Sequence, residues 1–130
     1  MNKWQRDVRN FHRKLGYAAP ESLTLATPEV LYLRRRLVAE EARELLEALG
    51  DGDPANIAGE CVDLLYVVLG TAVSLGIDLG PHWQAVHGAN MGKEAGPRGS
   101  KARKPAGWKG ADHSEILCAQ VSRRWWQFWK

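Results

Sequence analysis

The stretch of sequence that decides the fold is residues 57–68, which read Ile-Ala-Gly-Glu-Cys-Val-Asp-Leu-Leu-Tyr-Val-Val. Glu60 and Asp63 are its only charged residues, and their spacing places both carboxylates on one face of a helix. Because the helix is apolar nearly all round, we expect it to be central and buried. A buried carboxylate costs several kcal/mol unless a partner or a metal ion compensates it. The stretch therefore predicts a helical core that contains a charged site.

Start and stop signals on both sides of this stretch predict further helices. The signals are capping residues, prolines in a first turn and glycines after a last turn. They predict helices over residues 4–15, 27–49, 53–75 and 80–91, and a short last helix that starts at Asp112 or Ser114. Residues 92–110 are rich in Gly, Pro, Lys and Arg, which is typical of a loop. No strand pattern is visible, so we expect an all-α fold of four to five helices.

Length and composition bound the class of protein. A chain of 130 residues with 45% apolar residues is expected to fold as one domain. The net charge of +3 is too small to argue for nucleic acid by itself. The two cysteines have no metal-binding spacing, and Cys61 is expected to be a buried free thiol in a reducing cytoplasm. The N-terminal residues lack a signal-peptide pattern, and the run over residues 64–79 is shorter than a membrane span needs. We expect a cytoplasmic protein that binds neither membrane nor nucleic acid.

A second acidic cluster lies in the helix predicted over residues 27–49. Glu41 and Glu44 border the apolar stripe of this helix, whereas Glu40 and Glu47 lie further round. For Glu47 the simplest expectation is a surface ion pair with Arg43.

Glu41 and Glu44 acquire a role when they are considered with Glu60 and Asp63. Arginines 34–36 could pair with one of the buried carboxylates, but the two glutamates add further negative charge. Four convergent carboxylates are best explained by a hard divalent cation with oxygen ligands, Mg²⁺ or Mn²⁺.

The two acidic motifs together resemble a known family. Glu41-Ala42-Arg43-Glu44 followed by Glu60-Cys61-Val62-Asp63 is similar to the ExxE and ExxD signature of the MazG-like all-α nucleoside triphosphate pyrophosphohydrolases. His87-Gly88-Ala89-Asn90-Met91-Gly92-Lys93 looks like the HxxNxxK element of that superfamily. The Gly-, Pro- and Lys-rich residues 96–108 resemble the basic tail of its dUTP-hydrolysing subgroup.

The resemblance implies a function and a set of site residues. It implies hydrolysis of a nucleoside triphosphate, dUTP or another deoxynucleotide first, to the monophosphate and pyrophosphate. Mg²⁺, for which Mn²⁺ can substitute, would be held by Glu41, Glu44, Glu60 and Asp63, and Glu40 would position or deprotonate the attacking water. The implied substrate-binding residues are Asn90, Lys93, Arg98, Lys101, Lys104 and Trp108. For Trp108, stacking on a base and packing of the loop are both open. We expect a homodimer or homotetramer, with residues 1–112 as the pyrophosphohydrolase domain and residues 113–130 as a basic, aromatic helical tail.

Two other functions fit parts of the same sequence. Phosphoribosyl-ATP pyrophosphohydrolase shares the helical fold and the carboxylate pattern, and is the nearest enzymatic alternative. A non-catalytic helical module that binds nucleic acid or a membrane surface is the alternative of another class. Its support is the basic and aromatic segment at residues 123–130. For the Trp125–Trp129 cluster itself we expect packing against a partner subunit or the chain's own core.

Overall fold

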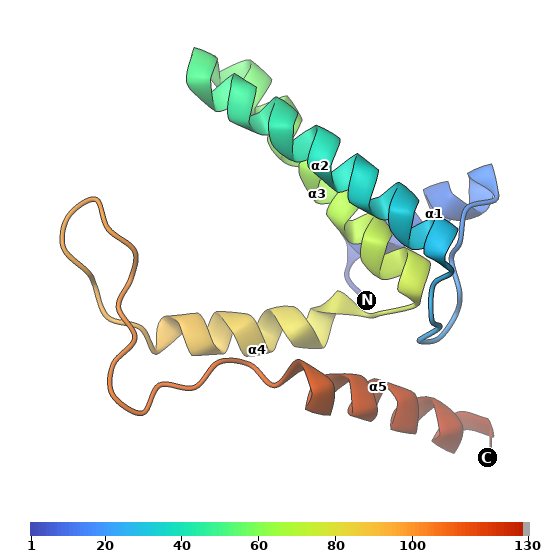
Figure 1. Cartoon of the computed structure of the whole chain (residues 1–130). Coiled ribbons are helices and arrows are strands. Elements are labelled where there is room, and N and C mark those ends of the chain that lie inside the picture. Colours follow the sequence, from blue (N-terminus) through green and yellow to red (C-terminus); the bar gives the residue numbers. More distant parts are fainter. Residues whose placement is uncertain (129–130) are drawn as a thin grey trace. The chain divides into compact units, whose positions relative to one another are not determined.

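The computed structural model describes the backbone of residues 1–128 and the side chains of residues 1–122. Within these residues the structure contains five helices and no strand, which confirms the all-α prediction (Figure 1). The helices are α1 (Lys3–Leu15), α2 (Pro28–Asp51), α3 (Pro54–Leu75), α4 (Leu79–Met91) and α5 (His113–Phe128). The prediction for the Trp125–Trp129 cluster lies outside the described side chains. The chain divides into two compact units, residues 1–77 and residues 78–130.

Capping residues set the bounds of the helices in the first unit, as the sequence predicts. The side chain of Thr27 accepts a hydrogen bond from the backbone N–H of Val30 at the start of α2, and Asp53 accepts one from Ala55 at the start of α3. Gly52 ends α2 and Gly76 ends α3, both in the left-handed conformation. Helix α2 ends at Asp51, two residues later than predicted, because its C-cap is Gly52 and Gly50 is still helical.

The first unit is an antiparallel hairpin of α2 and α3 with α1 packed against one end of α3 (Figure 1). Gln5 of α1 donates a side-chain hydrogen bond of 2.5 Å to the carbonyl of Ile77, just after α3. The rings of Phe11 in α1 and Tyr66 in α3 meet edge to face, with 5.5 Å between their centroids. Helix α1 therefore packs mainly against the C-terminal half of α3, from about Tyr66 onward.

Gly76 allows the loop before α2 to close over this end of the hairpin. Its φ is +66°, and a Cβ on it would lie 2.1 Å from the carbonyl oxygen of Ser22, so no larger residue fits. The backbone N–H of Thr24 donates to the carbonyl of Leu75 at 3.0 Å. The loop is thus tied to the C-terminus of α3.

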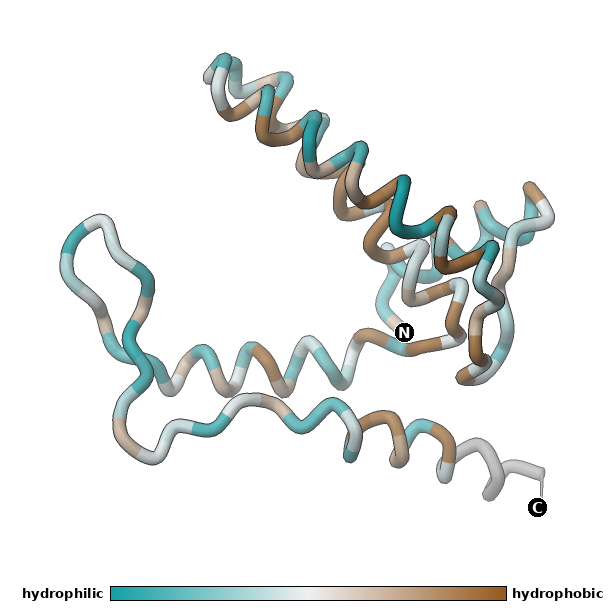
Figure 2. The backbone as a smooth tube through the Cα atoms, in the orientation of Figure 1, coloured by the Kyte–Doolittle hydropathy of each residue, from teal (hydrophilic) through white to brown (hydrophobic). Residues whose placement is uncertain are grey.

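The expectation that α3 is buried along its whole length is wrong. Its buried residues are Leu69, Gly70, Ala72, Val73 and Ser74, all in its C-terminal half. Val62 in the N-terminal half is 60% exposed, and Cys61, predicted to be buried, is exposed as well. The physical reason lies within residues 1–77: α1 meets α3 at Tyr66 and just past its end at Ile77, so the N-terminal half of α3 packs mainly against α2. Apolar segments (brown in Figure 2) therefore continue along the hairpin beyond its buried end.

Helix α3 is also long and apolar enough to cross a membrane by length and composition, with a mean hydropathy of 1.6 over the best window. The core helix of a globular domain meets the same criterion. The two carboxylates Glu60 and Asp63 lie within this helix, which makes it a costly membrane span.

The second unit is built on α4 and α5, which run antiparallel. The side chain of Gln120 in α5 bonds the backbone of Asp78, accepting from its N–H at 3.1 Å and donating to its carbonyl at 2.8 Å. Four residues later, Nδ1 of His82 lies 2.8 Å from Nδ1 of His113. The loop between the helices has one backbone bridge, between Glu94 and Arg103.

Candidate metal centre

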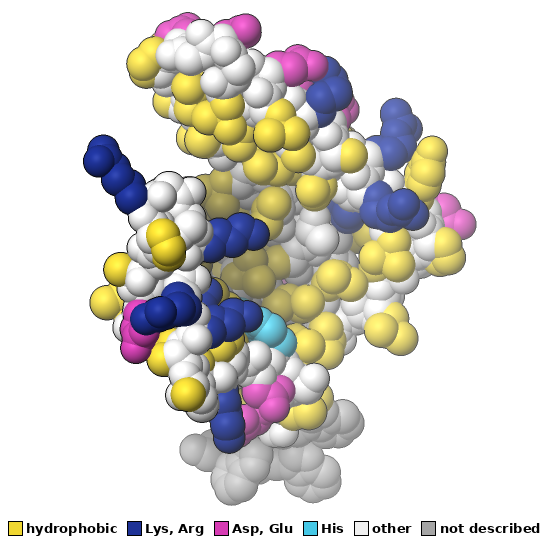
Figure 3. Space-filling view, turned by 60° about the vertical axis from the view of Figure 1, so that its left-hand side comes forward, with side chains coloured by type: hydrophobic (Ala, Val, Ile, Leu, Met, Phe, Trp, Pro, Cys, Tyr) yellow, Lys and Arg dark blue, Asp and Glu magenta, His cyan; other side chains and the backbone are white. Residues whose placement is uncertain are grey.

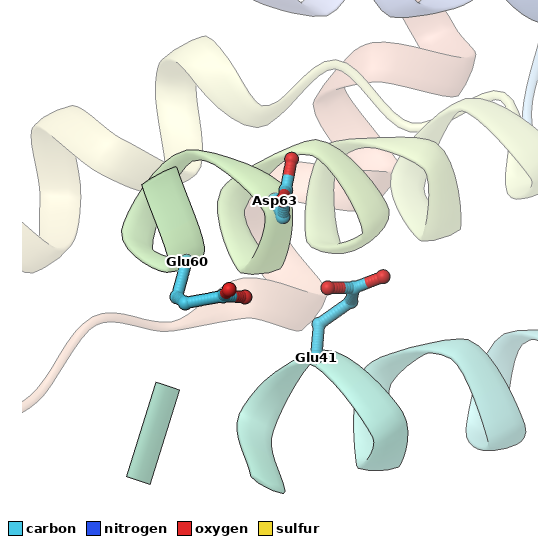
Figure 4. Close-up of side chains that lie close together, drawn as sticks. All are labelled: Glu41, Glu60 and Asp63. Carbon is cyan, nitrogen blue, oxygen red and sulfur yellow. The ribbon is translucent and has the colours of Figure 1, made fainter. Parts of the chain in front are cut away.

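The α2–α3 hairpin brings three of the predicted carboxylates together. Glu41 extends from α2, and Glu60 and Asp63 extend from successive turns of α3 (Figure 4). One oxygen atom of each carboxylate lies within 4.8 Å of the other two. Glu60 and Asp63 are three residues apart on one face of α3, and the facing position on α2 adds Glu41.

The electrostatics of this cluster favour a bound cation. The pKa of Glu41 is raised by partial burial and then by repulsion from Glu44, Asp63, Glu40 and Glu60. Oε2 of Glu60 is buried, and no hydrogen-bond donor reaches it among the described residues. A buried carboxylate oxygen without a donor is costly, and a divalent cation with oxygen ligands removes both the cost and the repulsion. The donor set therefore fits Mg²⁺ or Mn²⁺.

The arginines of α2 do not compensate the cluster. The Nη1 atom of Arg43 lies 2.7 Å from Glu47, the surface ion pair that the sequence predicts. Arg36 lies over the ring of Tyr32, and Arg34 bonds α3 at a different point. In the part of the chain that the structure describes, no ion pair is formed by Glu41, Glu60 or Asp63.

Glu44 and Glu40 lie at the edge of the cluster. Glu44 is half-buried, and its Oε1 lies 3.6 Å from Nη2 of Arg43 rather than with the three clustered oxygens. Glu40 is exposed. Both are close enough to raise the pKa of Glu41. Helical periodicity alone could not separate Glu41 from Glu44, because both border the same apolar stripe.

The predicted substrate-binding residues all lie in the second unit, where three of them come together. The Nζ atoms of Lys93 and Lys104 lie 5.1 and 4.8 Å from the centroid of the Trp108 ring. Nε1 of Trp108 donates to the carbonyl of Ala89 at 2.6 Å, which fastens the loop to α4. These contacts favour the packing role of Trp108 over base stacking.

The remaining residues of this predicted group are not part of that contact. Asn90, Arg98 and Lys101 are exposed. The basic side chains of the loop are visible in dark blue in Figure 3. An ion pair of 2.7 Å between Arg103 and Glu94 closes the base of the loop. This pair was not predicted, and its only signal in the sequence was opposite charge on two segments flanking Gly96-Pro97.

Sequence reasoning also missed a buried polar group at the opposite end of the hairpin. Arg34 is 6% exposed, His12 is 2% exposed, and both lie against Gly70 of α3. Arg34 was considered only as a partner for the carboxylates. A glycine in the middle of an apolar helix was the one available signal that another group approaches the backbone there.

The fold and the carboxylate cluster together define the class of all-α nucleotide pyrophosphohydrolases. Comparison with known families agrees, since residues 8–90 match the family model of phosphoribosyl-ATP pyrophosphohydrolase. The chain belongs to this family. The match includes all four predicted metal ligands and Asn90, and it ends before the basic loop.

A curated relative adds a more distant similarity. The chain is 33% identical over 76 residues to the uncharacterized protein L479 of Acanthamoeba polyphaga mimivirus. The aligned segment is 55% of this chain and 30% of that protein, so the chain corresponds to less than a third of the relative's length.

Proposed function

We propose that the chain hydrolyses a nucleoside triphosphate to the monophosphate and pyrophosphate in a reaction that depends on a divalent cation. The observation that carries the proposal is the cluster of Glu41, Glu60 and Asp63 in a chain of the phosphoribosyl-ATP pyrophosphohydrolase family. In this reaction a water oxygen bonds to the α-phosphorus and the bond from that phosphorus to the α–β bridging oxygen breaks. Pyrophosphate leaves with the bridging oxygen.

In this proposal Glu41, Glu60 and Asp63 hold Mg²⁺, or Mn²⁺ in its place, and Glu44 completes the acidic rim. A bound divalent cation lowers the pKa of water and offsets phosphate charge. Glu40 is exposed beside Glu41 and is the proposed group that orients the water or accepts its proton. Lys93 and Lys104, held together by Trp108, supply positive charge for the leaving phosphates. Asn90, Arg98 and Lys101 are exposed and are proposed to complete the contacts to the substrate.

Two substrates remain candidates within this reaction. dUTP is proposed first, because residues 96–108 resemble the basic tail of the dUTP-hydrolysing subgroup. Phosphoribosyl-ATP is the second candidate, and the family match over residues 8–90 favours it. Both substrates would be cleaved at the same type of bond, so the carboxylates serve either one. The choice depends on contacts with the base and sugar.

A panel of nucleotides tests the reaction and ranks the two substrates. The chain is incubated with each common NTP, each dNTP and phosphoribosyl-ATP in Mg²⁺ or Mn²⁺, and the products are separated by chromatography. We expect monophosphate and pyrophosphate. Accumulation of a nucleoside diphosphate with orthophosphate, or absence of turnover with every nucleotide, would overturn the proposal.

We also propose that the chain forms a homodimer or a larger even-numbered assembly. The carboxylate end of the hairpin leaves Leu46, Leu49 and Val62 between 54% and 70% exposed, which is a large apolar area for a monomer (Figure 3). A mainly apolar pocket of about 320 Å³ lies beside it and is lined by Trp4, Asp7, Val8, Val62, Leu65, Tyr66 and Leu69. Light scattering after size exclusion measures the assembly, and a monomer at micromolar concentration would contradict this part.

A further inference from the structure

Arg34 forms directional bonds from α2 to α3 at a point remote from the carboxylates. Its Nη2 donates to the carbonyl oxygen of Val67 at 2.8 Å, and its Nε donates to Oγ1 of Thr71 at 3.3 Å. The side chain is 6% exposed, and within the described residues no carboxylate pairs with it. Burial lowers the pKa of Arg34, which shows that its charge is kept at a cost. An apolar residue would avoid this cost, so the directional bonds are the better explanation of an arginine here.

Gly70 makes room for this arrangement. A Cβ on Gly70 would lie 2.6 Å from Nη2 of Arg34 and 2.9 Å from Nε2 of His12. The guanidinium therefore lies directly on the backbone of α3, in a space that any side chain at position 70 would fill. His12 is held in turn by a 2.9 Å hydrogen bond between its Nδ1 and the carbonyl of Ala18. His12 of α1 and Arg34 of α2 thus both lie against Gly70 of α3.

One alignment of α2 with α3 determines both the contact of Arg34 with α3 and the approach of the carboxylates. Glu41 lies seven residues after Arg34 on α2, and Glu60 lies seven residues before Val67 on α3. Seven residues are about two helical turns, so Glu41 is on the same face of α2 as Arg34, and Glu60 on the same face of α3 as Val67. In an antiparallel pair, Arg34 opposite Val67 therefore places Glu41 opposite Glu60.

Apart from the covalent connection through Gly52 and Asp53, the hydrogen bonds of Arg34 are the only ones that join α2 to α3 among the described residues. Apolar packing between the two points is not directional and allows sliding, and a shift of one residue displaces a side chain by about 1.5 Å along the helix axis. Without a cation, repulsion among the carboxylates pushes α2 and α3 apart at the other end. Single buried polar groups are known to fix the register of packed helices.

We infer that Arg34 is a positioning residue for the metal site, which acts by locking the register of α2 against α3 through Val67 and Thr71. The inference rests on the proposed function, since it assumes that Glu41, Glu60 and Asp63 bind the cation. It assigns Gly70 a supporting part, because a Cβ at this position would displace the guanidinium from its present place. It requires no contact between Arg34 and the nucleotide.

The test is Mn²⁺ affinity of the full chain, measured by calorimetry at low temperature where circular dichroism shows each variant to be folded. Arg34→Met keeps the length of the side chain and removes its donors. In the parent structure Oγ1 of Thr71 already donates to the carbonyl of Val67 at 3.0 Å. This carbonyl therefore keeps a side-chain donor when the guanidinium is removed. We expect Mn²⁺ affinity to fall about tenfold. Arg35→Met, an exposed arginine on the same helix, is the matched control and should bind as the parent does.

Further variants separate positioning from simple stability. Arg34→Lys retains a donor and should recover part of the affinity for Mn²⁺. Thr71→Val and Gly70→Ala disturb the contacts of Arg34 with α3 without removing the arginine, and each should weaken Mn²⁺ binding. A merely structural role would lower the melting temperature and leave the affinity of the folded protein unchanged. Parent-like affinity in folded Arg34→Met, Thr71→Val and Gly70→Ala would overturn the inference. Parent-like affinity in Glu60→Gln would instead overturn the metal site itself, and the inference with it.

Discussion

The two ends of the α2–α3 hairpin differ in burial and in charge. At one end α1 and the loop around Ser22 cover α3, Val73 is 1% exposed, and the buried arginine is bonded to the backbone. At the other end, within residues 1–77, α3 packs mainly against α2, Val62 is 60% exposed, and carboxylates of the two helices lie close together. The first end is complete within one chain, whereas the second needs a cation and, in our proposal, a second subunit. Stability and function are therefore expected to respond to different ends of the same two helices.

The largest expected effect is on turnover at the carboxylate end. Glu60→Gln removes a charged ligand while keeping the shape of the side chain, and it should lower turnover of the preferred nucleotide by about a thousandfold. The metal-free protein should not lose stability, because the substitution also removes repulsion from Glu41. Steady-state pyrophosphate release and thermal melting in a chelator measure the two quantities. Glu47→Gln, on the exposed face of α2, is the control and should retain activity. Equal turnover in the two variants would contradict the proposed site.

The second effect is the response of stability to metal. A cation that binds only the folded chain should stabilise it by about 2.7 kcal/mol at a concentration one hundred times its Kd. Melting curves over a Mn²⁺ titration should show this as a rising midpoint. Asp63→Asn and Glu60→Gln should lose most of this rise. Substitutions at the arginine end should, in addition, shift the melting midpoint of the metal-free protein. An undiminished rise in both carboxylate variants would show that the cation binds elsewhere.

The third effect compares one type of substitution at the two ends. Val73→Ala creates a cavity in the covered half of α3 and should lower the free energy of unfolding by about 2 kcal/mol. Val62→Ala in the uncovered half should change it by less than about 0.5 kcal/mol in a monomer. Urea denaturation at several protein concentrations distinguishes the cases. If Val62→Ala costs as much as Val73→Ala and weakens assembly, the uncovered half lies in an interface between subunits.

The same contrast explains which features the sequence could predict. Capping residues and the helical period are local signals, so the bounds of α3 and the placement of Glu60 and Asp63 on one face followed from them. The approach of Glu41 to these two residues is not local, and its prediction depended on considering the two acidic motifs together. Burial is not local, and an apolar helix does not reveal how far its neighbours extend. The predictions for Cys61 and for the N-terminal half of α3 failed for this reason. Arg34 was missed because a buried arginine bonded to backbone has no pattern in sequence that distinguishes it from its exposed neighbours Arg35 and Arg36.

The smallest expected effect is a pH dependence of stability that arises at the arginine end. Burial lowers the pKa of His12 below its ordinary value of 6.5, the bond to Ala18 opposes this, and the charge of Arg34 lowers it further. Because the bonded carbonyl can only accept, Nδ1 carries a proton, and the lowered pKa favours the neutral form of the buried ring. The unfolded chain thus binds a proton at a higher pH than the folded chain does. Stability from this histidine is fully present above pH 6.5 and is lost as the pH falls from 6.5 toward the lowered value.

His12→Asn tests this sign directly, because the asparagine amide can still donate to the carbonyl of Ala18 and has no charge to gain. The loss of stability on acidification is at most about 1.4 kcal/mol per pH unit for one proton, and the variant should lose less than the parent does between pH 7 and pH 5.5. His82, whose pKa is also lowered by burial and by His113, contributes with the same sign in the second unit and leaves a residual slope. If His12→Asn retains the full slope of the parent, the acid sensitivity does not arise beside Arg34, and the covered end of the hairpin is not the part of the chain that acid attacks.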